Sequence, residues 1–148
     1  VAEPRDEKVR PRTSTDAQFS LPYSVAVALV EGQAFFEQYR EPFLSDERVL
    51  ALADRVHVEH DPALDEAYPD KWGARVEVTT EAGETHASTF ENCLGDPGNM
   101  PSRDALAGKV HALAERQLDE GAIDDLLTVI EDLDDAETVD GLASLIAR

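Results

Sequence analysis

Tyr23 is the first residue in this 148-residue chain whose type and setting could support chemistry. It stands inside a mostly aliphatic run that extends from Leu21 to Val30. A phenol buried in such a run must hydrogen-bond to some partner. It could donate to a substrate carboxylate or act as a general acid. The local sequence by itself favours a core tyrosine whose hydroxyl is satisfied by the protein.

A second group, His57, Glu59 and His60, has the residue types of a metal site. On a strand, His57 and Glu59 would share one face and His60 would point to the other. No further cluster of cysteine or histidine supplies the ligands that a tetrahedral site needs. We therefore expect no metal site and no cofactor.

The third candidate is the loop Gly95–Pro101, which is rich in glycine and proline. It lacks the Gly-Lys-Ser/Thr ending of a phosphate-binding loop, and it does not have the form of a dinucleotide fingerprint. Its backbone N–H groups lead into a helix that Ser102 should cap, and they could receive an anion there. A connection that needs glycine geometry is the simpler interpretation.

The elements that position these residues follow from periodicity, capping residues and turn residues. Residues 1–14 are expected to be extended. Helices are predicted over residues 21–31, from about 45 to 53, from about 103 to 118 (ending before Gly121), and around 126–130 and 139–146. A strand is predicted at residues 56–60. A hairpin is predicted with its two strands at residues 74–79 and 85–90. The predicted fold class is α+β, with a small antiparallel or mixed sheet packed with helices. It divides into an α+β domain over residues 1–101 and a helical segment over residues 102–148.

Charge is the strongest signal in the composition, because 13 lysine and arginine residues face 32 acidic ones. The net charge of −19 repels nucleic acid and anionic membranes, so neither is expected as a partner. The single cysteine, Cys93, has no adjacent base and favours a reducing, cytoplasmic setting. Lysine is scarce and the acids are spread along the chain, which predicts a halophilic source, since molar salt screens self-repulsion.

Four stretches occur in the order typical of one known family. They are the A-x-F-S-L-x-Y run at 17–23 with the Glu31-Gly32 ending of its helix, residues 56–79, the Gly95-Asp96-Pro97-Gly98-Asn99 loop with Ser102 and Lys109, and the tail at 130–135. Together they resemble the second domain of the MmgE/PrpD family over essentially the whole chain. Met100-Pro101 departs from the family's usual order in the loop.

The resemblance implies an α+β lid and closing helices, without the helical domain that holds most catalytic residues in this family. It implies part of a lyase for small di- or tricarboxylates, with dehydration or hydration of a 2-methylcitrate-like substrate as the expected reaction. Tyr23 would reach the active site as a hydrogen-bond donor or proton relay. Arg10 and Arg12 would steer the polyanionic substrate, and Gly98 and Asn99 would bind it.

Surplus apolar surface on the helices at 21–31 and 122–147 suits a partner. The expected partner is a helical catalytic domain in trans, onto which the C-terminal helices would dock, or a second copy in a homo-oligomer such as a dimer. Without the helical domain the chain is expected to be inactive. Because it starts at Val1 and not at a methionine, a processed chain or a fragment is expected. Two alternatives stay open: a dicarboxylate epimerase of the same family, and a non-catalytic acidic interaction domain or truncated remnant.

Overall fold

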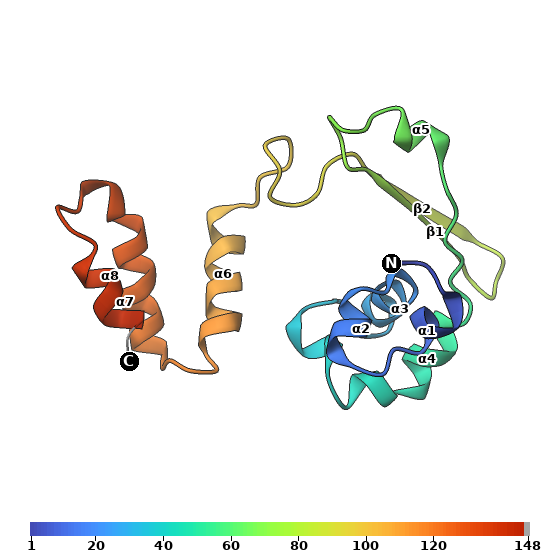
Figure 1. Cartoon of the computed structure of the whole chain (residues 1–148), viewed down its shortest axis with the longest axis horizontal. Coiled ribbons are helices and arrows are strands. Elements are labelled where there is room, and N and C mark those ends of the chain that lie inside the picture. Colours follow the sequence, from blue (N-terminus) through green and yellow to red (C-terminus); the bar gives the residue numbers. More distant parts are fainter. Residues whose placement is uncertain (147–148) are drawn as a thin grey trace. The chain divides into compact units, whose positions relative to one another are not determined.

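A computed structural model describes residues 1–146 of the chain (Figure 1). The chain divides into two compact units, which we call the N-terminal unit (residues 1–62) and the C-terminal unit (residues 63–148). Most of the regular elements in both units are helices, and the described residues contain one two-stranded antiparallel sheet. The predicted α+β fold class is confirmed.

The N-terminal unit is built from short helices and 3-10 turns (Figure 1). They are α1 (Arg5–Val9), α2 (Ser14–Gln18), α3 (Leu21–Glu31), η1 (Phe36–Tyr39), η2 (Phe43–Ser45) and α4 (Glu47–Ala53), while α5 (Pro62–Asp65) begins at the end of this unit. The prediction of an extended stretch over residues 1–14 is wrong for α1. That helix begins after Pro4 and places Asp6 and Glu7 in its first turn, where acidic side chains favour a helix dipole.

Helix α3 begins and ends where the sequence predicts. The Ser20 side chain accepts a hydrogen bond from the Tyr23 backbone N–H at 3.1 Å and so caps the helix. Pro22 lies in the first turn, and Gly32 closes the helix with a φ of 75°, a left-handed conformation that favours glycine. One face of α3 packs against α4, whereas Leu29 remains 49% exposed.

The core of the N-terminal unit joins α1, α2, α3 and α4. Its members are buried apolar side chains from all four helices: Val9, Ala17, Tyr23, Ala26, Val27, Val49 and Ala53. By contrast, the strand predicted at 56–60 does not form, and that prediction is wrong. A strand needs a hydrogen-bonding neighbour, and the only sheet in the described residues is the hairpin further along the chain.

The C-terminal unit begins with that hairpin and continues with helices. Its main elements are β1 (Ala74–Thr79), β2 (Thr85–Phe90), α6 (Arg103–Ala114), α7 (Glu120–Glu131), η3 (Leu133–Asp135) and α8 (Asp140–Ile146). The predicted hairpin is confirmed, with Val76 opposite Ser88 and a left-handed Gly83 in the turn. Helix α6 stops earlier than expected, and Gly121 lies inside α7, because Asp119 caps α7 by accepting from the Ala122 N–H at 2.9 Å.

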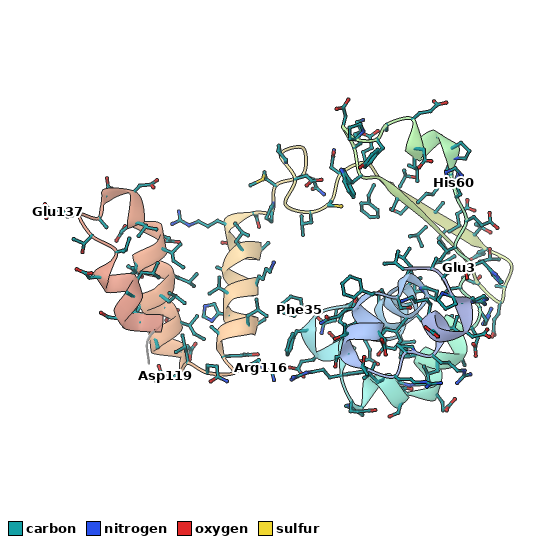
Figure 2. The ribbon with its side chains drawn as sticks, in the orientation of Figure 1. Glu3, Phe35, His60, Arg116, Asp119 and Glu137 are labelled. Carbon is teal, nitrogen blue, oxygen red and sulfur yellow. The ribbon has the colours of Figure 1, made fainter. Side chains whose placement is uncertain are left out.

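Burial in the C-terminal unit is sparse. Ile123 on α7 is its one buried apolar side chain among the described residues, and α6 buries none. Acidic residues such as Asp119 and Glu137, labelled in Figure 2, lie exposed around α7. None of the helices in the described chain combines the length and apolarity that crossing a bilayer requires.

Candidate functional site

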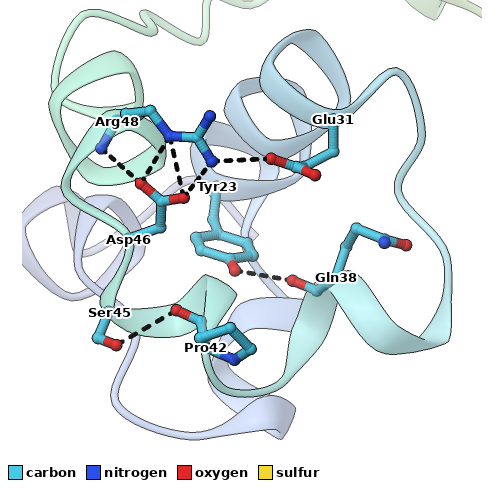
Figure 3. Close-up of polar contacts among 7 residues, drawn as sticks. All are labelled: Tyr23, Glu31, Gln38, Pro42, Ser45, Asp46 and Arg48. Carbon is cyan, nitrogen blue, oxygen red and sulfur yellow. Dashed lines mark hydrogen bonds and ion pairs between the residues drawn. The ribbon is translucent and has the colours of Figure 1, made fainter.

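Tyr23 lies on α3 with no exposed surface. Its hydroxyl donates a hydrogen bond to the Gln38 main-chain oxygen at 2.8 Å, as Figure 3 shows. Burial, followed by nearby groups that include Glu41 and Asp46, raises the pKa of Tyr23 to about 12. The phenol is therefore neutral at physiological pH, where it can donate a proton in a hydrogen bond but does not act as a base.

A second tyrosine ties the same two elements together. Tyr39 donates from its hydroxyl to the Ser24 hydroxyl at 3.0 Å, and its ring centroid lies 6.1 Å from that of Tyr23. Gln38, which is 5% exposed, accepts at its side-chain oxygen from the Phe35 N–H at 3.1 Å. Two phenol hydroxyls therefore link α3 to η1: that of Tyr23 on α3 donates to η1, and that of Tyr39 on η1 donates to α3.

An ion-pair network that the sequence analysis did not identify lies in the same close-up as Tyr23 (Figure 3). Arg48 on α4 contacts Glu31 at the end of α3 at 3.1 Å and Asp46 at 2.6 Å. Asp46 also caps α4 by accepting from the Arg48 N–H at 2.8 Å. The hydrogen bonds from Arg48 hold the pKa of Asp46 below its ordinary value. In the sequence, an aspartate followed two residues later by an arginine at the start of a helix could have indicated the contact between Asp46 and Arg48.

The two arginines predicted to steer substrate differ in their surroundings. Arg10 forms an ion pair with Asp54 at 2.6 Å, and both side chains are about half exposed, at 52% and 42%. Arg12 is exposed just before α2. Within residues 1–146, the structure shows no ion pair for Arg12. Of the two guanidinium groups, that of Arg12 is therefore the one without a carboxylate partner in residues 1–146.

The loop that contains Gly98 and Asn99 is held mainly by its own backbone. The Asn99 N–H donates to Asp96 O at 2.8 Å, and its side-chain amide donates to Asn92 O at 3.1 Å. A Cβ at Gly98 would come within 2.8 Å of the Asn92 side-chain amide nitrogen, so a larger residue here would displace the Asn92 side chain. Gly98, Asn99 and the end of β2 line an open hollow of about 270 Å³.

Another hollow, of about 160 Å³, lies in the N-terminal unit. Arg5, His57 and Glu59 are among the residues that line it. The sequence singled out His57 and Glu59 only as possible metal ligands, and it gave no role to Arg5. Across residues 1–146, no three His, Cys, Asp or Glu residues are grouped closely enough to hold a metal ion.

The structure brings only part of the predicted site into one unit. Tyr23, Arg10 and Arg12 belong to the N-terminal unit, whereas Gly98 and Asn99 belong to the C-terminal unit. Neither of the two hollows described above includes Tyr23. Contact of these five residues with a substrate stays a prediction.

Comparison with known proteins gives two findings. Residues 2–135 match the family model of the MmgE/PrpD C-terminal domain. Over 136 residues the chain is 24% identical to the cis-aconitate decarboxylase of Mus musculus, an alignment that covers 92% of this chain and 28% of the mouse enzyme. The chain therefore spans less than a third of the length of this relative.

Proposed function

The chain belongs to the MmgE/PrpD family as a C-terminal domain, and we propose that it is the lid and closing segment of a lyase for small di- or tricarboxylates. The expected reaction is the dehydration or hydration of a 2-methylcitrate-like substrate. The observation that carries this proposal is the match over residues 2–135, together with the similarity to a cis-aconitate decarboxylase.

We further propose that a helical domain completes the active site. The Tyr23 hydroxyl already donates to Gln38, and neither hollow contains this phenol. Turnover requires a positioned proton donor beside a bound substrate. A helical domain, in the same polypeptide or as a separate chain, would supply the remaining catalytic groups and the wall of the substrate cavity.

Arg12 is the better candidate of the two arginines for attracting a polycarboxylate. A substrate that bound Arg10 would compete with Asp54 for the guanidinium group. An exposed arginine keeps its donors for bidentate binding of a carboxylate. The net charge of −19 otherwise repels such a substrate, so a local cation must offset that field.

Gly98 would contribute through its backbone N–H, and the side-chain oxygen of Asn99 would accept a hydrogen bond from a substrate hydroxyl. The loop amides of Gly95, Asp96 and Asn99 already donate to carbonyl oxygens inside the loop. In the described residues the Gly98 N–H makes no such backbone hydrogen bond, and Gly98 is among the residues that line the open hollow. This amide is the loop donor that would face a substrate carboxylate.

The proposal is tested by assaying the chain in complex with its helical domain. The complex is recovered in molar potassium chloride, and 2-methylcitrate, cis-aconitate and a dicarboxylate pair that differs in configuration are supplied as substrates. Turnover of a tricarboxylate is the expected result. Turnover of the dicarboxylate pair alone would favour the epimerase, and a complex inactive on all of them would contradict the proposal.

The role of Tyr23 is tested with the variant Tyr23→Phe in that complex. A proton-relay role predicts a fall in kcat of about 100-fold or more. Tyr39→Phe is the matched control, because it removes a phenol hydroxyl that links the same two elements. If both variants lower kcat equally, Tyr23 supports the fold and does not act on the substrate.

A further inference from the structure

Two aromatic side chains lie together on the surface near the start of the C-terminal unit. Tyr68 and Trp72 are 59% and 61% exposed, and their ring centroids are 5.1 Å apart with an angle of 65° between the ring planes. The rings meet edge to face, so their contact covers only part of each ring. Single exposed apolar residues are ordinary, whereas apolar side chains grouped on a surface mark interaction sites.

The main chain that carries Trp72 is held on both sides. The preceding residue, Lys71, forms an ion pair with Glu91 at 2.6 Å, and the Cys93 thiol donates to the Trp72 main-chain oxygen at 3.7 Å. On the other side, a Cβ at Gly73 would come within 2.9 Å of the main-chain oxygen that ends β2. Trp72 is therefore fixed against the end of β2 while its side chain stays exposed. A ligand that binds such a fixed ring loses little affinity to ordering of the main chain.

The charges around the two rings favour a cationic ligand. Glu66 and Asp70 stand two residues before and two residues after Tyr68, and both are exposed. The one lysine or arginine in residues 63–74 is Lys71, whose ammonium group is already in an ion pair. With 20 acidic and 6 basic residues, the C-terminal unit attracts cations and repels anions and further copies of itself.

An arginine side chain is the cation that suits both the rings and the acids. Its planar guanidinium group can lie over an aromatic face and can also donate two parallel hydrogen bonds to a carboxylate. Tryptophan is the most favourable ring for the first contact. The N-terminal unit shows the same geometry within the chain, because the Arg40 guanidinium carbon lies 4.6 Å from the centre of the Phe36 ring.

We propose that Tyr68 and Trp72 form a docking surface for a basic segment of a partner protein. An arginine of that segment stacks on the Trp72 ring, and Glu66 and Asp70 accept hydrogen bonds from the arginines of the segment. Tyr68 holds the indole at its edge and extends the apolar surface. This inference is independent of the proposed catalytic function, since neither ring belongs to the candidate site.

Fluorescence of Trp72, the single tryptophan of the chain, measures this binding directly. The probe is a short peptide of alternating arginine and glycine, and two further peptides carry lysine or glutamine in place of arginine. A saturable change in emission is expected with the arginine peptide, binding about fivefold weaker with the lysine peptide, and none with the glutamine peptide. Equal binding of the arginine and lysine peptides, or of the arginine and glutamine peptides, would overturn the proposal.

Variants of the aromatic residues locate the binding surface. Tyr68→Leu keeps an apolar side chain but removes the ring that contacts Trp72, and it should weaken binding of the arginine peptide about threefold. The matched control is Phe19→Leu, because Phe19 is also 59% exposed but lies in the N-terminal unit. Unchanged binding by Tyr68→Leu, or an equal loss in both variants, would refute this docking surface.

Variants of the acids separate a local contact from a general attraction to the acidic chain. The double variant Glu66→Gln, Asp70→Asn should weaken binding about tenfold at low salt. The control is Glu81→Gln, Glu84→Gln, which removes the same charge from exposed positions in the turn of the hairpin. The control should weaken binding less than about twofold. Equal losses in the two double variants would mean that binding follows net charge alone, contrary to the proposal.

Discussion

The N-terminal unit encloses a core of buried apolar side chains, whereas residues 63–146 bury a single one, Ile123. Charge is divided just as unequally. The N-terminal unit has 12 acidic and 7 basic residues, and the C-terminal unit has 20 and 6. Apolar burial is the main stabilising term in folding, and uncompensated like charges oppose it. From this contrast we predict that the first unit is stabilised by its own core and that the second depends on salt or on a partner.

The largest expected effect tests this contrast with one truncation in each unit. Tyr23→Ala removes a fully buried side chain from the core, and such changes cost about 3–5 kcal/mol of unfolding free energy. Leu113→Ala removes a side chain on α6 that is 43% exposed, and it should cost less than about 1 kcal/mol.

Hydrogen exchange, measured separately on peptides from each unit, shows which unit each of the two variants destabilises. Tyr23→Ala should lower the protection of α3 and α4, which pack against each other. Leu113→Ala should leave both units close to the unmodified chain. A larger loss for Leu113→Ala would mean that α6 belongs to a core as substantial as that of the N-terminal unit.

The parts of the fold that sequence predicted correctly are those encoded by neighbouring residues. Ser20 and Gly32 set the two ends of α3, and the alternation around Val76 with a glycine turn set the hairpin. The strand expected near Val58 failed because alternation indicates a strand only where another strand pairs with it.

The candidate site was harder to predict for a similar reason. Tyr23 could be identified as a phenol that needs an acceptor, but its acceptor is the main-chain oxygen of Gln38, fifteen residues along the chain. A carbonyl is present at every residue, so no side-chain pattern marks this one. The Arg48 link to Glu31 likewise depends on how α3 and α4 pack.

A smaller effect is expected from the ionisation of Tyr23. Its pKa is raised from 10.0 to about 12 in the folded chain, so the folded state holds this proton more tightly than the unfolded state. The corresponding stability is fully present below pH 10 and is lost as the pH rises toward 12. The loss amounts to about 2–3 kcal/mol.

The difference between the unmodified chain and Tyr23→Phe isolates this ionisation. The near-ultraviolet absorbance of phenolate should contain a late component that the variant lacks, and the variant should lose less stability in the same pH range. An unmodified chain whose phenolate absorbance all develops near pH 10 would show that Tyr23 is accessible to water, contrary to its burial on α3.

The smallest expected effect is the dependence of stability on salt. It should differ between the two units because their charges differ. The C-terminal unit combines the greater excess of acids with the smaller core, so screening should stabilise it more than the N-terminal unit. From low to molar potassium chloride we expect a gain of about 1 kcal/mol, or several degrees in Tm. Fluorescence of Trp72, the single tryptophan, reports this transition from within the C-terminal unit. A Trp72 transition that does not rise with salt would contradict both this assignment and a halophilic source.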